Sequence, residues 1–178
     1  MIITALSQEL IPQLQRIMEL GAPYVRVRTY SDYWLYANLF SSSCPVALID
    51  NTVVGAIIAF RSQDIPDDLY VQDVVTHPEH RHRGVARVLL EKVRRRAAEW
   101  GCARVYLTSE PENTTAHATW ISLGFVNLPG DRMVGGVSVI TDLKGPAKTA
   151  RFMKLTWHHL RIPDRATGRA GQTPPDTY

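Results

Sequence analysis

The sequence predicts a single domain of mixed α/β class, and three observations support this prediction. Short apolar runs alternate with amphipathic stretches along most of the 178 residues, a length that suits one domain with a buried core. Two of the apolar runs flank Asp50-Asn51, a pair typical of a hairpin turn. A later apolar run is followed by a long helical stretch and a further run, as in two parallel strands joined by a helix.

The first 60 residues are expected to form a strand, two helices and a hairpin. Ser7 is placed as the N-cap of the first helix, whose apolar residues recur at helical spacing, and Gly21 ends that helix. Asp50 and Asn51 tolerate positive φ, so they are expected to form the hairpin turn. In order, the elements are a strand at 2–5, helices at 7–20 and 31–40, and strands at 45–49 and 53–60.

The rest of the chain continues the alternation. Gly84, Gly101 and Gly124 mark the start of one helix and the ends of two. A loop rich in Gly, Asp and Lys extends to about Lys148, and the segment 158–178 is expected to be a mobile tail, so the folded domain spans 1–157. In order, the elements are strands at 69–76 and 104–108 around a helix at 84–100, a helix at 114–123, a strand opening at Phe125, and a strand at 151–157.

The junction RHRGVAR, residues 81–87, has the properties of an anion site. It follows the carboxyl end of the strand 69–76, where open α/β sheets bind ligands. The first amides of a helix lack partners, and the helix dipole adds roughly half a positive charge. Gly84 lets an oxygen atom approach the backbone closely, and Arg83 and Arg87 add charge. The sequence therefore predicts a phosphate or pyrophosphate site, with a solvated basic helix face as the alternative.

Common nucleotide motifs do not fit this junction, which has neither Gly-Lys-Ser/Thr nor G-x-G-x-x-G. Arg81, Gly84 and Ala86 instead form an R-x-x-G-x-A pattern after a strand. With the two blocks VQDVVTHPEHRHRGVARVLLEKV and CARVYLTSEPENTTAHATWISLGF, the chain resembles the GNAT superfamily of acyl-CoA-dependent N-acyltransferases from about Ile65 to Phe125. The resemblance implies a largely antiparallel twisted sheet with one parallel strand–helix–strand unit and flanking helices, and acetyl-CoA as co-substrate.

The resemblance also implies positions that bind the cofactor. The end of the strand 69–76 is implied to pair its backbone with the pantetheine arm, and the following residues are implied to surround the pyrophosphate with main-chain amides. Asn113 looks like the family's cofactor-contacting asparagine, and a helix cap is its alternative role. The implied cofactor-binding residues are Val74, Val75, Thr76, Arg81, His82, Arg83, Gly84, Val85, Ala86, Arg87 and Asn113.

One departure from the family pattern concerns the proton donor for the leaving thiolate. The family often has a tyrosine four residues before the glycine that corresponds to Gly124, and here that residue is Trp120. An indole N–H donates a hydrogen bond but does not release its proton near neutral pH. Trp120 is therefore expected either to form a wall beside the thioester or to be a core residue. Ser109, Tyr106, His117 and water are the nearby alternatives for the donor.

Asp73 lies inside a predicted strand, where a charged residue needs a physical reason. A primary amine with a pKa of about 10.4 is mostly protonated at pH 7, so acyl transfer to it requires a base or a desolvating pocket. Strict alternation places Asp73 on the same face as Leu69 and Val75. Asp73 is expected to bind or deprotonate the amine, with a structural carboxylate as the equal alternative. Glu110 and Glu112 are the second choice for the base.

The acceptor is predicted to be a primary amine of a small molecule, such as an amino acid derivative, a polyamine or an aminated antibiotic. Tyr30, Tyr33 and Trp34 belong to an aromatic cluster in the region that forms one wall of the acceptor site in the GNAT family, and helix packing is their alternative role. The aspartates within 64–68 would favour a cationic acceptor or be solvated turn residues. With the loop 129–148, these residues would form a semi-enclosed pocket rather than a peptide groove.

Composition limits the other classes of function. The longest apolar run, Val53–Phe60, has eight residues and is too short to cross a bilayer, so no membrane segment is expected. The chain has two cysteines, and its histidines at 77, 80 and 82 lack convergent partners, so we expect no metal site and a cytoplasmic location. The net charge of +3 does not by itself indicate nucleic acid, and RNA or DNA binding by the basic helix is a minor alternative.

Three further questions stay open from the sequence. A protein or peptide N-acetyltransferase is the first alternative to a small-molecule enzyme. A catalytically silent acyl-CoA-binding module is the second, because the tyrosine of the family pattern is replaced by Trp120. A homodimer is also left open, since nothing in the sequence decides the oligomeric state.

Overall fold

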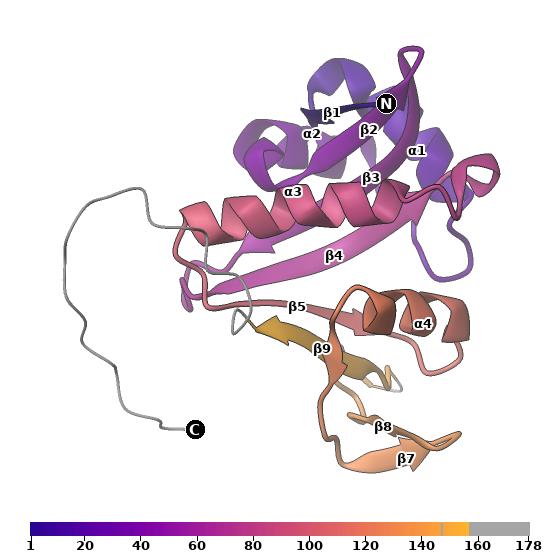
Figure 1. Cartoon of the computed structure of the whole chain (residues 1–178), viewed down its shortest axis with the longest axis vertical. Helices are drawn as coiled ribbons and strands as arrows, with labels where there is room; N and C mark the ends of the chain where they lie inside the picture. Colours follow the sequence, from indigo (N-terminus) through magenta and orange to yellow (C-terminus); the bar gives the residue numbers. More distant parts are fainter. Residues whose placement is uncertain (147, 157–178) are drawn as a thin grey trace.

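The computed structural model describes residues 1–146 and 148–156. Within them, seven strands form one twisted sheet in the order β1-β2-β3-β4-β5-β9-β6 (Figure 1). The pair β4–β5 is parallel and the other neighbours are antiparallel, which confirms the predicted mixed α/β class with a largely antiparallel sheet. The strands are β1 (Ile2–Ala5), β2 (Pro45–Ile49), β3 (Thr52–Arg61), β4 (Asp68–Thr76), β5 (Arg104–Ser109), β6 (Val126–Asn127) and β9 (Arg151–Thr156).

Helices cover both faces of this sheet (Figure 1). α1 and α2 pack on one face, and α3 and α4 contribute to the core on the other. None of the helices in the described part of the chain combines the length and the apolar character that a bilayer crossing requires. The helices are α1 (Ile11–Glu19), α2 (Tyr30–Leu39), α3 (Val85–Glu99) and α4 (Thr114–Ser122), with short 3-10 turns η1 (Gln8–Leu10), η2 (Ser41–Ser43) and η3 (Pro78–His80).

β3 lies at the centre of the packing and buries side chains on both faces. Ile57 belongs to the core cluster beneath α3, whereas Ile58 belongs to the cluster beneath α1 and α2. Gly55 lets α3 approach the sheet closely, since a Cβ at this position would lie 2.6 Å from Cγ1 of Val85. Burial on both faces explains why the run 53–60 is continuously apolar rather than alternating.

A β-bulge interrupts β4 and changes the direction of its later side chains. Ile58 and Ala59 are neighbours in β3, but their partners are Asp73 and Val71, so Gln72 is the extra residue. Val71 consequently belongs to the core beneath α3, whereas Val75 belongs to the core beneath α1 and α2. The expected strict alternation from residue 69 to residue 75 is therefore wrong, because a bulge shifts the faces by one residue.

β4 and β5 separate just beyond this bulge. Their parallel pairing ends at Val71 and Leu107, although β4 continues to Thr76 and β5 to Ser109. Figure 1 shows the two strands diverging toward their carboxyl ends, with α3 above them and α4 below. We refer to this opening between β4 and β5 as the splay. It gives ligands a way between two strands that are paired elsewhere.

The first elements differ in detail from the prediction. Ser7 stands at the N-cap of η1, but its side chain makes no capping hydrogen bond, and α1 begins only at Ile11. α2 begins at Tyr30, one residue earlier than expected, because Thr29 and Asp32 form a reciprocal capping box. The predicted hairpin turn is confirmed, since Asp50 and Asn51 have φ values of 48° and 61°.

The expected loop at 129–148 contains a second, two-stranded sheet. Its strands are β7 (Arg132–Val134) and β8 (Val137–Val139), and they flank Gly135 and Gly136, which both have positive φ. A two-residue turn of this kind suits two glycines, so the Gly-Gly pair between two short runs was a hairpin signal. The segment 158–178, for which a mobile tail was expected, lies outside the described residues.

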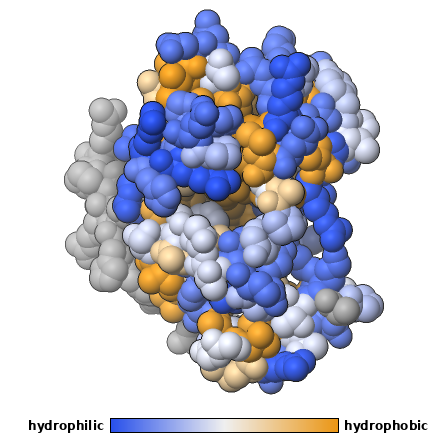
Figure 2. Space-filling view, turned by 90° about the vertical axis from the view of Figure 1, so that its right-hand side faces the viewer, coloured by the Kyte–Doolittle hydropathy of each residue, from blue (hydrophilic) through white to orange (hydrophobic). Residues whose placement is uncertain are grey.

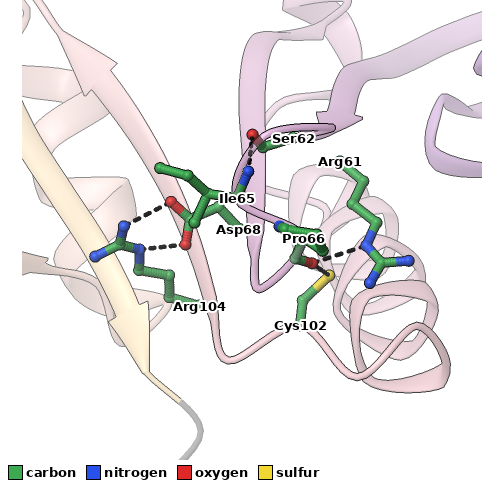
Figure 3. Close-up of polar contacts among 7 residues, drawn as sticks. All are labelled: Arg61, Ser62, Ile65, Pro66, Asp68, Cys102 and Arg104. Atoms are coloured by element: carbon green, nitrogen blue, oxygen red, sulfur yellow. Dashed lines mark hydrogen bonds and ion pairs between the residues drawn. The ribbon is translucent and has the colours of Figure 1, made fainter. Parts of the chain in front are cut away.

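The amino-terminal end of β4 carries a buried ion pair (Figure 3). Asp68 is 4% exposed and accepts hydrogen bonds from Nε and Nη2 of Arg104. The carbonyl of Asp67 accepts the amide of Arg104 at 3.1 Å, and Cys102 Sγ donates to the carbonyl of Pro66 at 3.6 Å. Asp68 therefore stabilises the fold at the end of β4 opposite the splay, whereas Asp67 has an exposed side chain in a turn, the alternative role weighed from the sequence. Neither residue lines the two cavities.

Candidate functional site

The loop between β4 and α3, residues 77–84, has the backbone of an anion site, and we refer to it as the anion loop. His82 and Gly84 adopt left-handed conformations, with φ values of 60° and 78°. The amide of Val88 donates to the carbonyl of Gly84 at 3.0 Å, so the three amides between them precede the first intrahelical bond. A Cβ on Gly84 would meet no atom within 4 Å. The open surroundings and the free amide positions suit an anionic ligand at the start of α3.

The side chains of this loop have different surroundings. Arg83 and Arg87 are exposed and add positive charge beside the amides. Arg81 instead turns back, and its Nε donates to the carbonyl of Thr76 at 3.4 Å, which ties the loop to the end of β4. Val85 is 3% exposed and belongs to the core cluster, so it can offer a ligand only its backbone.

Two cavities meet at the splay. The larger has a volume of about 900 Å³, and the smaller, of about 80 Å³, lies between β4, β5 and α4. Figure 2 shows this side of the molecule hollowed between its upper and lower halves, with apolar surface deep in the hollow. Molecules that enter the two cavities can therefore meet at the residues they share. The shared lining residues are Tyr24, Gln72, Asp73, Thr108, Ser109 and Glu110.

The end of β4 offers an unpaired backbone edge to the splay. Val74, Val75 and Thr76 pair with β3 on one side, while the pairing with β5 on the other side stops at Val71. The side chain of Val74 lines the smaller cavity, and that of Val75 is buried in the core beneath α1 and α2. The backbone of these three residues is thus placed as a partner for an extended ligand.

Asp73 lies on the wall that the two cavities share, directly after the bulge. Its side chain is 9% exposed, and Oδ2 lies 3.6 Å from Nη2 of Arg28. Burial raises the pKa of the Asp73 carboxyl, and the charge of Arg28 offsets this only in part. Arg28 is held in turn, because its amide donates to the hydroxyl of Tyr33 at 3.2 Å. A carboxyl with a raised pKa in a cleft is a candidate for proton transfer.

Trp120 and Asn113 border the smaller cavity from α4. Trp120 is 8% exposed, and its ring packs edge-on against Phe125 with centroids 5.8 Å apart, so it is both a core residue and a cavity wall. Oδ1 of Asn113 accepts the amide of Ala116 at 3.1 Å, so Asn113 is the N-cap of α4. The two roles weighed for each residue from the sequence are therefore compatible.

Comparison with known families decides the family of this domain. The profile described as the acetyltransferase (GNAT) family matches residues 11–125, more than half of the chain. The chain belongs to the GNAT family. The match includes β4, the anion loop, α3, β5 and α4, which are the elements around the splay.

Individual relatives of this GNAT domain differ in their acceptors. The L-2,4-diaminobutyric acid acetyltransferase of Nocardia farcinica (strain IFM 10152) is 29% identical over 91 residues, which are 51% of this chain and 47% of the relative. The chain thus matches about half the length of that relative. Diaminobutyrate acetyltransferase from Paenibacillus lautus, solved with its substrate and coenzyme A, has 16% identity and a TM-score of 0.69 over 90% of this chain and 98% of its own.

A solved protein N-acetyltransferase is also similar in fold. The ribosomal-protein-S18-alanine N-acetyltransferase of Escherichia coli has 15% identity and a TM-score of 0.67 over 93% of this chain and 99% of its own. A likeness at this identity shows the fold alone. The residues of this domain's own cavity therefore bear on which acceptor it binds.

The larger cavity of this GNAT domain has an excess of positive charge. Arg28 is the only one of its five cationic residues that pairs with a carboxylate among the described residues. The loop 129–148, expected from the sequence to border the acceptor pocket, contains three of these residues, but sequence reasoning singled out none of the five side chains. The cationic lining residues are Arg26, Arg28, Arg132, Lys144 and Lys148, and the carboxylates are Asp73, Glu110 and Glu112.

The aromatic residues expected to contact the acceptor lie elsewhere. Tyr33 is fully buried in the core beneath α1 and α2, whereas Tyr30 and Trp34 are 50% and 45% exposed. None of the three lines either cavity, and the aromatic residue of this region that lines both is Tyr24. Clustering in the sequence did not distinguish them, because helix phase decides which ring points inward.

Among the alternative proton donors, only Ser109 lines the cavities. His117 lies outside both linings, and burial, together with the charge of Arg151, lowers the pKa of its imidazole. The described residues contain no group of three or more His, Cys, Asp and Glu side chains that could hold a metal ion. Nδ1 of His77 instead accepts the amide of Glu79 at 3.3 Å and caps η3.

Proposed function

We propose that this GNAT domain is an acetyl-CoA-dependent N-acetyltransferase whose acceptor is a small primary amine that also carries a carboxylate. The observation that carries the proposal is the junction of two cavities at Asp73, one between β4, β5 and α4 and the other rich in unpaired cations. Acetyl-CoA supplies the activated acetyl group, and the splay is where that group and the amine come together.

The donor half of the site fits acetyl-CoA. The amides at the start of α3 and the exposed Arg83 and Arg87 suit the pyrophosphate. The unpaired edge of β4 suits the amide groups of the pantetheine arm, and Asn113 and Trp120 border the inner end of that path. These supports are independent of one another, since they come from a helix terminus, a strand edge and a cavity wall.

Asp73 is the residue that binds the acceptor ammonium and removes its proton in this proposal. A primary amine with a pKa of about 10.4 is neutral in roughly one molecule in 2,500 at pH 7, so it needs a base near the thioester. Among the residues that the structure describes, Asp73 and Glu110 are the two carboxylates that line both cavities. Its raised pKa strengthens it as a base relative to an ordinary aspartate.

The positive charge of the larger cavity is the reason to expect a carboxylate on the acceptor. Cationic side chains without an anionic partner, such as Arg132 and Lys148, gain most from a ligand that brings a negative charge. A polyamine or an aminated antibiotic would meet repulsion from the same residues. An amino acid derivative carries both the amine and the carboxylate. L-2,4-diaminobutyric acid, named for two of the similar proteins, is such a derivative.

The size of the larger cavity favours one alternative acceptor. About 900 Å³ exceeds what a single amino acid fills, so the amino terminus of a peptide also fits, with its side chains or carboxylates near Arg26 and Arg132. The similar fold of a solved ribosomal-protein-S18-alanine N-acetyltransferase agrees with this alternative.

A matched pair of acceptors tests the proposal. Thiol release from acetyl-CoA is measured with 2,4-diaminobutyrate and with 1,3-diaminopropane, which differ only in the carboxylate. We expect kcat/KM to be roughly 10- to 100-fold higher for the diamino acid, as for one charge-assisted hydrogen-bond pair. Arg132→Gln should remove most of this preference, whereas Arg95→Gln, on the solvated face of α3, should leave it unchanged.

Other outcomes point elsewhere. A preference for the diamine would exclude the carboxylate requirement. Turnover of peptide amino termini without turnover of either small amine would support the alternative acceptor. Binding of coenzyme A by calorimetry without acetylation of any amine would identify a silent binding module. Absence of coenzyme A binding would contradict the donor half of the site.

A further inference from the structure

Three polar side chains form a connected row from the larger cavity to the splay. Nζ of Lys144 donates to the hydroxyl of Tyr70, and that hydroxyl lies 3.3 Å from Oγ1 of Thr108. Lys144 lines the larger cavity, and Thr108 lines both cavities. Thr108 is also the first residue of β5 beyond its last pair with β4. The row therefore ends where the two cavities meet.

The chemistry of the three groups fixes which one donates in each hydrogen bond of the row. A lysine ammonium only donates hydrogen bonds, so the hydroxyl of Tyr70 must accept from Lys144. The single proton of Tyr70 then remains for Oγ1 of Thr108. Thr108, having accepted one bond, has its own proton left for a ligand in the splay. The row is thus a proton-donating chain that ends at Thr108, with a positive charge at its far end.

The ring of Tyr70, in the middle of the row, has packing partners of its own. The ring of Tyr70 packs against that of Tyr106 with centroids 5.1 Å apart, and Nζ of Lys144 lies 5.1 Å from the centroid of the Tyr70 ring. Tyr106 is stacked in turn on Phe152 at 5.1 Å. Packing on both sides limits the positions of the Tyr70 hydroxyl, which favours proton transfer along the row.

We propose that Thr108 is the proton donor to the departing thiolate, resupplied by Tyr70 and Lys144. As the C–N bond forms and the C–S bond breaks, Thr108 gives its proton to sulfur, Tyr70 gives its proton to Thr108, and Lys144 gives one to Tyr70. Water in the larger cavity returns a proton to Lys144. An isolated threonine hydroxyl, like the Trp120 indole, does not release its proton near neutral pH, so Thr108 acts only because Tyr70 and Lys144 replace its proton in the same step. The net proton donor is the Lys144 ammonium. Ser109 lines both cavities as well, but the described residues show no comparable donor behind it.

The inference rests on acetyl transfer but not on the identity of the acceptor. Any amine that the enzyme acetylates serves for the test, so failure of the diamino acid proposal would appear as a missing acceptor preference. Failure of the present inference would appear as unchanged catalysis in the Thr108 and Tyr70 variants with the best available amine.

Thr108→Val and Tyr70→Phe remove the hydroxyls with little change of shape, and Tyr106→Phe is the matched control from the same aromatic stack. We expect kcat to fall by roughly 10- to 100-fold in the first two, the low end for a general acid because a thiolate with a pKa of about 8.5 leaves readily. Thr108→Ser should restore most of the rate. Tyr106→Phe should stay within about twofold of the wild type, since its hydroxyl lies outside both linings.

A binding measurement tests the row without turnover. Calorimetry compares coenzyme A with desulfo-coenzyme A at pH 7 and pH 9.5, where the free thiol is mostly ionised. Because Asp73 and Arg28 face the same cavity, each variant is compared with the wild type at the same pH. We expect the wild type to gain about tenfold in preference for coenzyme A at the higher pH, and Thr108→Val to lose that gain. Equal preferences in both proteins, or a large loss of kcat in Ser109→Ala with none in Thr108→Val, would overturn the inference.

Discussion

Replacement of Asp73 by asparagine separates catalysis from stability. Oδ2 of Asp73 lies 3.6 Å from Nη2 of Arg28, which corresponds to an attraction of about 4 to 5 kcal/mol at an effective dielectric constant of ~20. The pKa of the carboxyl is nevertheless raised, because desolvation on burial outweighs the favourable charges and hydrogen bonds around it. A neutral amide of the same shape avoids that cost, and Arg28, which is 31% exposed, can be hydrated in its place.

The expected result is a protein that loses activity without losing stability. At pH 7, Asp73→Asn should lower kcat by roughly 10²- to 10⁴-fold, the range for a general base. Its melting temperature should be unchanged or up to ~4 °C higher, since 1 kcal/mol shifts a domain of this size by about 2 to 4 °C. The affinity for coenzyme A should stay the same, because the anion loop is untouched.

The difference in stability between Asp73→Asn and the wild type should depend on pH with a definite sign. The folded-state pKa of Asp73 is raised above the unfolded value of about 3.9, so the wild type has its full stability below pH ~4 and loses part of it as pH rises through the folded pKa. The asparagine variant lacks that loss, so its stability relative to the wild type should increase above pH ~4 and then level off.

Thermal melts at several pH values and calorimetry with coenzyme A provide the measurements. Asp64→Asn, in an exposed turn, is the control and should change neither melting nor turnover. A variant of Asp73 that melts earlier than the wild type at pH 7, or that turns over at the wild-type rate, would refute the reasoning and identify Asp73 as a structural carboxylate.

The remaining predictions concern the backbone of the anion loop, the buried ion pair and the thiols. Gly84→Ala should cost about 1 to 2 kcal/mol by thermal melting, because φ is 78° while no atom within 4 Å opposes the new Cβ; an unchanged melting temperature would contradict the left-handed geometry. Arg104→Leu should destabilise the fold by about 1 to 3 kcal/mol in urea unfolding, because it leaves the buried carboxylate of Asp68 unpaired. The loss should be smaller than for a fully buried ion pair, since Arg104 is 42% exposed. A neutral effect would show that Asp68 does not need its partner. Cys44 and Cys102 should resist thiol reagents in the native state, because burial raises the pKa of both and that of Cys44 to about 12, and rapid labelling of either would contradict this burial.

Sequence reasoning succeeded where the signals are local. The start of α3 could be predicted because a glycine and a basic loop follow a strand directly, and the structure places Gly84 in a left-handed N-cap. The parallel pair β4–β5 followed from the helix between the two strands. The role of Asn113 as a cap followed from its place before a helical stretch.

The bulge and the walls of the larger cavity depend on long-range contacts. Gln72 has no local feature that marks it as an extra residue, since the bulge exists only relative to the register of β3. Lys144 is 74 residues from its partner Tyr70, so no spacing rule connects them. Tyr33 and Trp34 are neighbours in the sequence, yet one is buried and the other is half exposed. Local patterns thus predicted the elements around the splay better than the walls of the larger cavity.

The small sheet β7–β8 stands apart from the main sheet, to which the neighbouring bridge between Ile140 and Ala150 connects it (Figure 1). It supplies Arg132 and Val134 to the larger cavity and contributes nothing to the anion loop. Exchanging this hairpin as a cassette between relatives should therefore redirect the choice of amine while leaving thioester recognition intact. Divergence of acceptor preference within such domains would then require changes in only a few residues of this hairpin.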